Sequence, residues 1–217
     1  YEKSLGIHEK VQGEEHPNTA ASYNNLAGVY TLQEKYKEAE NLYEKSLRIK
    51  EKVLGEEHPN TAESYNNLAE VYERQGRYME AEELHEKSLR ITEKILGEEH
   101  PDTAIAYNNL AGVYESQGRY MEAEELYGKS LCIKERILGK EHLDTATCYN
   151  NLAYLYDKQG KYKEAVIYFL KAYKICVSKL GWNHPKTDSC YKSLEKIYTE
   201  NYPKEDFKQF LEEAMRD

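Results

Sequence analysis

Pairs of adjacent asparagines recur along this 217-residue chain, and their amides are the side chains best suited to recognise a ligand. Asparagine is a poor helix former, so its recurrence within helical patterns needs a physical reason. One interpretation is structural, with each amide bonded to a neighbouring helix. The other is recognition, because an amide offers both a donor and an acceptor to an extended peptide backbone. Both interpretations stay open at this point. The pairs are Asn24-Asn25, Asn66-Asn67, Asn108-Asn109 and Asn150-Asn151.

Histidines recur at steps of 42 residues, each in a Gly-x-x-His motif. One histidine per repeat cannot converge on a single metal ion, whose ligands lie about 2 Å from it. We therefore interpret these residues as linkers that precede a helix, and we predict no metal site and no cofactor. His85 takes a place held by tyrosine or phenylalanine in other repeats, so we expect it to pack as an aromatic ring. The repeated histidines are His16, His58, His100, His142 and His184.

The cysteines are Cys132, Cys148, Cys176 and Cys190, and none of them forms a Cys-x-x-Cys motif. Cys148 and Cys190 are equivalent positions of successive repeats, which helix packing places about 10 Å apart, beyond the reach of a disulfide. We interpret the cysteines as small packing residues of a protein in a reducing compartment, and we predict a cytoplasmic location.

Composition excludes several classes of protein. The chain has 30 basic and 39 acidic residues, a net charge of −9, which argues against partners such as nucleic acid or anionic membrane. No apolar run approaches the roughly 20 residues of a membrane span, and no signal-peptide pattern opens the chain. No nucleophile-plus-base set, phosphate loop or carboxylate pair stands outside the repeat, so we predict that the protein is not an enzyme.

Each 42-residue unit shows the pattern of two helices. The first is expected from about Pro59 to Gln75, with apolar residues three and four positions apart. Asn60 and Thr61 follow the proline and are expected to help the free amides of the first turn. The second helix is expected from about Tyr78 to Leu96 and ends at a glycine. No segment alternates with a period of two, so no sheet is predicted.

Because one helical hairpin cannot bury both faces of its second helix, the units must stack, and contacts between repeats should supply most of the stability. The composition fits this interpretation. Seventeen of the 21 tyrosines fall in four recurring positions of the repeat. A thin array is never far from water, so a ring with a polar tip suits its core.

Tyr65, Leu68, Ala69, Tyr72, Ala81 and Ser88 resemble the tetratricopeptide-repeat signature. The 42-residue form, with Leu-Gly-x-x-His-Pro-x-Thr-Ala and Tyr-Asn-Asn-Leu-Ala, is similar to the kinesin light chain type of repeat. The resemblance covers residues 1 to about 200. It implies an all-α fold, a right-handed superhelical solenoid of antiparallel helix pairs.

The repeat divides the chain into six segments. Residues 1–13 match the second helix of a repeat whose first helix is missing, so we expect a fragment of a longer array. Residues 182–217 hold the fifth repeat and a C-terminal capping helix around Phe207 and Phe210. The segments are 1–13, 14–55, 56–97, 98–139, 140–181 and 182–217.

In tetratricopeptide proteins one stripe of each first helix lines the concave groove, and the resemblance places Glu63, Asn66, Glu70 and Glu73 on it. The equivalent positions are neutral in the first repeat, and in the fifth they hold two lysines. We expect a peptide to be held by the residues of this stripe and the asparagines beside it. These candidates are Asn24, Asn25, Asn66, Asn67, Glu70, Asn108, Asn109, Asn150, Asn151, Tyr154, Lys192 and Lys196.

We therefore predict a scaffold for protein–protein interaction that binds a peptide segment of a partner in its concave groove. The alternative is a regulatory or sensor array within a larger signalling or motor-adaptor protein. Self-association through the exposed N-terminal half-repeat is a further expectation.

Overall fold

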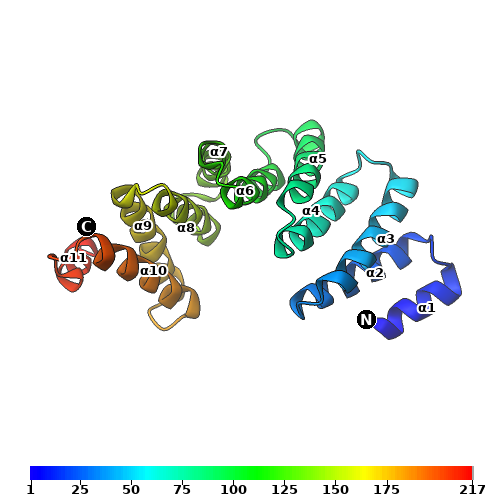
Figure 1. Ribbon diagram of the computed structural model, residues 1–217, viewed down its shortest axis with the longest axis horizontal. Helices are drawn as coiled ribbons and strands as arrows, with labels where there is room; N and C mark the ends of the chain where they lie inside the picture. Colours follow the sequence, from blue (N-terminus) through cyan, green and yellow to red (C-terminus); the bar gives the residue numbers. More distant parts are fainter. Residues whose placement is uncertain (217) are drawn as a thin grey trace. The chain divides into compact units, whose positions relative to one another are not determined.

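The computed structural model describes residues 1–216, and all regular secondary structure within this range is α-helical, as predicted (Figure 1). The helices form two compact units. The first unit, Tyr1–Gly118, contains α1 (Glu2–Gln12), α2 (Pro17–Leu32), α3 (Tyr36–Leu54), α4 (Pro59–Arg74), α5 (Tyr78–Leu96) and α6 (Pro101–Ser116). The second unit begins at Arg119 and contains α7 (Tyr120–Leu138), α8 (Leu143–Lys158), α9 (Tyr162–Leu180), α10 (Pro185–Asn201) and α11 (Phe207–Ala214).

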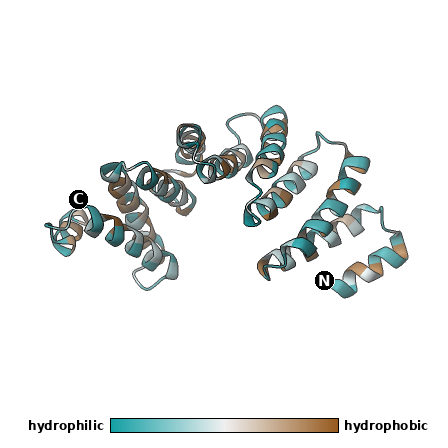
Figure 2. Ribbon diagram, viewed as in Figure 1, coloured by the Kyte–Doolittle hydropathy of each residue, from teal (hydrophilic) through white to brown (hydrophobic). Residues whose placement is uncertain are grey.

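Within each unit, helices that follow one another in the chain pack against one another. In the first unit α2 packs on α3, α3 on α4, α4 on α5 and α5 on α6, and α4 also contacts α2 and α6. In the second unit α8 packs on α7 and α9, and α10 on α9. Figure 2 shows that the helices carry both polar and apolar residues, as stacked amphipathic helices require. The apolar core of each unit is therefore distributed among pairs of neighbouring helices.

Small residues bring the helices close together. Ala27, Ala39 and Ala69 are completely buried, and Ala81 and Ala111 are buried in the same way. Ala27 and Ala39 pack in one core cluster with Tyr43 and Leu68, and Ala69 and Ala81 pack in another with Val113. An alanine at such a place lets two helix backbones approach, and a larger residue would force them apart.

Tyrosine phenols tie the first helices α2, α4, α6 and α8 to the second helix before each of them. Tyr23 donates to Glu9 and Tyr65 to Glu51, each at 2.7 Å. A further tyrosine seven residues along each of these four helices makes a similar bond, such as Tyr30 to Glu2 at 2.9 Å. Phenylalanine could not make these bonds, which explains why tyrosine dominates the aromatic residues. The other pairs are Tyr107–Glu93, Tyr149–Glu135, Tyr72–Glu44, Tyr114–Glu86 and Tyr156–Glu124.

A second polar link joins the loop within one helix pair to the second helix of the preceding pair. Gln75 Nε2 donates to Glu40 at 2.9 Å, and Arg77 Nη1 donates to the same carboxylate at 2.7 Å. In the second unit Gln159 and Lys161 hold Glu124 in the same way, each at 3.1 Å. The Gln-Gly-Arg/Lys sequence therefore has a packing role.

The recurrent histidines cap the first helices. Nδ1 of His58 accepts the backbone N–H of Asn60 at 3.1 Å, and the other four histidines make the same bond. The interpretation of these residues as linkers before a helix is confirmed, but the cap was expected from Asn60 and Thr61. Thr61 is instead buried and donates its hydroxyl to the carbonyl of Gly55 at 2.8 Å.

The helix α11 packs against the C-terminal part of α10. Phe207 is buried, and the rings of Tyr198 and Phe210 stack with their centroids 4.2 Å apart. Asp206 begins α11 by accepting the backbone N–H groups of Lys208 and Gln209. Among the described residues, no helix has the length and apolar character needed to span a membrane.

Tyrosine ionisation should make stability fall in alkali. Burial, and then the bond to Glu51, raise the pKa of Tyr65 above its ordinary value of about 10. Because the folded pKa lies above the unfolded one, this contribution is intact below about pH 10 and is lost as the pH rises further. Chemical denaturation between about pH 8 and pH 11 should show this decline, and Tyr65→Phe should make it shallower. The exposed Tyr162→Phe should leave the slope unchanged, and equal slopes for both variants and the parent chain would contradict this prediction.

Glu34 occupies a turn position that suits glycine. Its φ is 60°, whereas Gly76 and Gly160 have φ of 76° and 72° at the equivalent loops. A left-handed conformation costs a non-glycine residue about 1 kcal/mol. Glu34→Gly should therefore raise the free energy of unfolding by about 0.5–1 kcal/mol in a urea titration, and Gly76→Glu should lower it by a similar amount.

Gly128 provides the control for these substitutions. It lies inside α7, and an added Cβ there would meet open space. Gly128→Glu should therefore raise stability by about 1 kcal/mol, because glycine is a poor residue inside a helix. If Gly76→Glu and Gly128→Glu changed the free energy of unfolding in the same direction, turn geometry would be ruled out as the cause.

Candidate functional site

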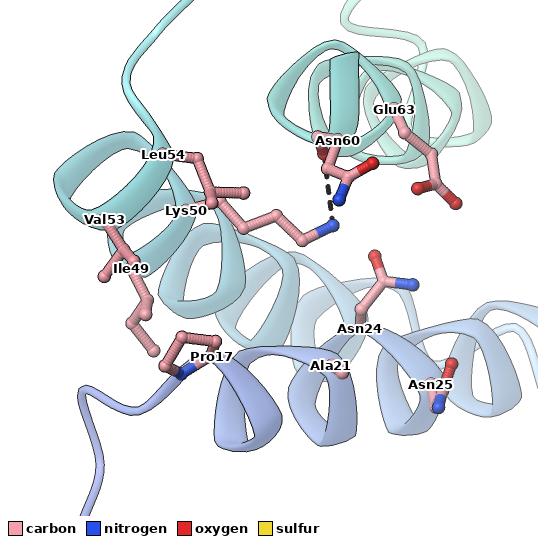
Figure 3. A pocket seen from close by; sticks show the side chains of 10 residues that line it. All are labelled: Pro17, Ala21, Asn24, Asn25, Ile49, Lys50, Val53, Leu54, Asn60 and Glu63. Atoms are coloured by element: carbon pink, nitrogen blue, oxygen red, sulfur yellow. Dashed lines mark hydrogen bonds between the residues drawn. The ribbon is translucent and has the colours of Figure 1, made fainter. Parts of the chain in front are cut away.

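A hollow of about 390 Å³ opens among α2, α3 and α4 in the first unit (Figure 3). The C-terminal end of α3 supplies apolar side chains, and the first turns of α2 and α4 close the sides. Two predicted candidates, Asn24 and Asn25, line it, although only Asn24 is half-buried. The full lining is Pro17, Ala21, Asn24, Asn25, Ile49, Lys50, Val53, Leu54, Asn60 and Glu63.

Lys50 and Glu63 are the charged residues of this hollow. The amino group of Lys50 donates to the backbone carbonyl of Asn60 at 3.2 Å, and Figure 3 shows it directed toward α4. Burial lowers the pKa of Lys50, and the nearby Glu63 acts in the opposite sense. A half-buried ammonium beside an amide and a carbonyl can receive an acceptor group from a ligand.

Hydrogen bonds connect some of the asparagines to the scaffold. Nδ2 of Asn67 on α4 donates to Oδ1 of Asn24 on α2 at 3.1 Å, which joins the first helices of two repeats. Asn66 instead lies 2.9 Å from Nδ1 of His85, whose Nε2 lies 2.9 Å from Glu73. His85 is buried as expected of an aromatic substitute, and it also forms this polar bridge. Asn24, Asn66 and Asn67 thus have structural partners.

A second hollow of about 240 Å³ lies among α8, α9 and α10 in the second unit. It contains three of the predicted candidates, Tyr154, Lys192 and Lys196. Burial raises the pKa of Asp157 in the same hollow, and the charge of Lys196 opposes that rise. Phe169, Ser193, Ile197 and Glu200 complete the lining.

Tyr154 is exposed because of the residue that packs beneath it. Its ring meets Phe169 edge to face with centroids 4.9 Å apart, and its hydroxyl lies 2.6 Å from Oγ of Ser193. At the equivalent places of the first repeat, Tyr43 faces Gly28, and an added Cβ on Gly28 would lie 3.4 Å from the Tyr43 hydroxyl. Phe169 has no hydroxyl at the place of the Tyr43 hydroxyl, so the first-helix stripe has room for the ring of Tyr154.

The charged candidates are partly compensated by neighbours on their own helices. Glu70 is exposed and pairs with Arg74 at 3.4 Å, and Lys192 pairs with Asp188 at 2.7 Å. These exposed pairs weaken the charge contrast expected between the second and fifth repeats. The remaining candidates Asn108, Asn109, Asn150 and Asn151 are half-buried on α6 and α8.

Sequence reasoning missed the contribution of the second helices. Ile49, Lys50, Val53 and Leu54 of α3 line the first hollow, but a stripe drawn on the first helices alone could not include them. Val53 and Leu54 are apolar yet exposed at the C-terminal end of α3, which only the structure reveals. Within residues 1–216, no group of three or more histidine, cysteine, aspartate or glutamate side chains is placed to hold a metal ion.

Comparisons with known proteins agree with this architecture. The sequence profile of the tetratricopeptide repeat matches residues 1–52, 27–78, 60–131 and 102–178. A crystal structure of nearly identical TPR-like repeats from Podosopora anserina, described as a kinesin light chain, is 31% identical, with a TM-score of 0.76 over 93% of this chain and 95% of that chain. A variant of that protein with one substitution is also 31% identical, with a TM-score of 0.76 over 93% of this chain and 94% of that chain.

The fold also resembles BtubC (BKLC) from P. vanneervenii, at 24% identity and a TM-score of 0.75 over 91% of this chain and 78% of that chain. No curated protein sequence matches the chain significantly.

The asparagine bond between α2 and α4 predicts a difference between two equivalent residues. Asn67→Ala removes the donor to Asn24 and should lower the free energy of unfolding by about 1 kcal/mol in a urea titration. Asn25 occupies the same repeat position but is exposed, so Asn25→Ala should change stability by less than about 0.5 kcal/mol. Equal losses in the two variants would show that the bond contributes nothing.

Proposed function

Because the chain belongs to the tetratricopeptide repeat family, a scaffold fold for protein–protein interaction, we propose that it binds a peptide segment of a partner protein in a groove lined by its first helices. The observation that supports this is the position of the two hollows. One of the two lies in each unit, and both contain residues of the stripe predicted to bind a peptide. Ala21, Asn24 and Glu63 line the first, and Tyr154, Lys192 and Lys196 line the second.

The first hollow favours a ligand with an apolar side chain beside a polar backbone group. Ile49, Val53 and Leu54 offer an apolar surface. Asn24 and Lys50 offer hydrogen bonds that can orient a main-chain carbonyl or a carboxylate. This combination of an apolar anchor with a few polar contacts is typical of peptide recognition and does not require a long ligand.

The asparagines have a double role in this proposal. Asn24 keeps its bond to Asn67, and its half-buried amide still faces the first hollow. A peptide would then meet an amide that is already oriented by the scaffold, which lowers the entropy lost on binding. The structural and recognition interpretations of the asparagine pairs are therefore compatible.

Charge would select among ligands more than it would add affinity. Glu63 and Glu70 on α4 favour basic residues in a segment that crosses this helix, whereas Lys192 already has Asp188 as a partner. Self-association through α1 and a cytoplasmic location remain separate predictions.

Filling the first hollow should test the proposal. Ala21 is exposed on α2 and lines the hollow, so Ala21→Arg places a long side chain in it while the helix is preserved. Peptides selected from a displayed random library for binding to the whole chain should lose at least about tenfold in affinity for this variant. The measurement is fluorescence anisotropy of the labelled peptides.

Asn41→Arg provides the matched control, because Asn41 is exposed on α3 and lies outside the hollow. It adds the same side chain and should leave peptide affinity unchanged. The proposal fails if no peptide is selected, or if the two arginine variants weaken binding equally.

A further inference from the structure

Two cysteine sulfurs meet between α9 and α10. Sγ of Cys176 lies 3.7 Å from Sγ of Cys190, and both cysteines are present as thiols. A disulfide has an S–S bond of about 2.05 Å, so the sulfurs must approach by less than 2 Å to form one. The sequence pattern did not reveal this pair, because its members lie 14 residues apart in two helices.

The repeat itself places these two positions together. In the first unit the equivalent residues are His8 and Ser22, and Nδ1 of His8 lies 2.6 Å from the Ser22 hydroxyl. The sequence separation is again 14 residues. The contact between these two positions therefore follows from the packing of a second helix against the first helix that comes after it in the chain. Only in the contact between α9 and α10 are both positions cysteine.

We propose that Cys176 and Cys190 form a reversible disulfide, a redox modification site that links α9 to α10, with a low-molecular-weight disulfide as the oxidant. One protein thiolate attacks the small disulfide, forms a mixed disulfide and releases one small thiol. The second protein sulfur then attacks the first, and the second small thiol leaves. Two protein thiols are oxidised, and the small disulfide takes up the two electrons and two protons.

Burial assigns different roles to the two sulfurs. Cys190 is half-buried and is the member that an oxidant can reach, whereas Cys176 is only 4% exposed. The mixed disulfide therefore forms on Cys190, and Cys176 resolves it. The hydrogen bond between the two sulfurs lowers the pKa of Cys176, with burial opposing, and raises the pKa of Cys190. The thiolate form is therefore favoured at Cys176, the sulfur that resolves the mixed disulfide.

The other cysteines lack this arrangement. Cys148, the equivalent of Cys190 one repeat earlier, is fully buried with its sulfur 3.7 Å from the Ser130 hydroxyl. Burial raises the pKa of Cys148, which keeps it as an unreactive thiol. Cys132 is exposed on α7 and can react only singly or between two chains. The proposal thus concerns one pair of thiols among four cysteines.

The test is oxidation of the whole chain with oxidised glutathione, followed by non-reducing peptide mapping and thermal unfolding. We expect a Cys176–Cys190 crosslink with a mass loss of about 2 Da and no retained glutathione at these residues. The oxidised chain should unfold at a Tm roughly 5 to 10 °C above that of the reduced chain, because the crosslink restricts the unfolded state. Dithiothreitol should restore the original Tm.

Two variants separate the proposal from simple surface oxidation. Cys176→Ser should retain glutathione on Cys190, because the resolving sulfur is missing, whereas Cys132→Ser should form the crosslink like the parent chain. If Cys176→Ser does not fold, the crosslink and Tm of the parent chain decide the matter. Glutathione retained on Cys190 of the parent chain, a crosslink through Cys132 alone, or an unchanged Tm would overturn the proposal.

Discussion

The hydrogen bond from a buried tyrosine to a glutamate on the preceding helix is the interaction on which the repeat depends. Tyr65 and Glu51 illustrate it: the ring fills the apolar seam, and the hydroxyl reaches a carboxylate at the edge of that seam. Such a pair fixes both the separation and the register of two helices. Within each unit, the repeated bond positions the first helices α2, α4, α6 and α8 against the second helices that precede them.

This construction explains the division between polar and apolar groups in the candidate grooves. The second helices use their carboxylates for tyrosines and loop residues, so the first-helix stripe is left for amides, small residues and a few charges. Gly28 leaves space for the Tyr43 hydroxyl, and Tyr154 appears where Phe169 has none. The surface offered to a partner is therefore set by the packing beneath it.

The contact between α9 and α10 departs from the same plan. Val177 replaces the glutamate of the earlier repeats, and Tyr191 donates to Glu195 on its own helix. At this place, where the polar link between neighbouring helices is missing, Cys176 and Cys190 face each other. A covalent bond there would restore a connection that the other repeats make with tyrosine and glutamate.

The sequence by itself determined the repeat length, the helix bounds and the all-α fold, because local periodicity repeated every 42 residues carries that information. It also indicated Asn24, Tyr154 and Lys196, which do line hollows. Only the tertiary structure decided that Lys50 enters the first hollow, that Asn66 bonds to His85, and that Cys176 meets Cys190. These contacts join residues on different helices, and their partners depend on side-chain packing that periodicity does not encode.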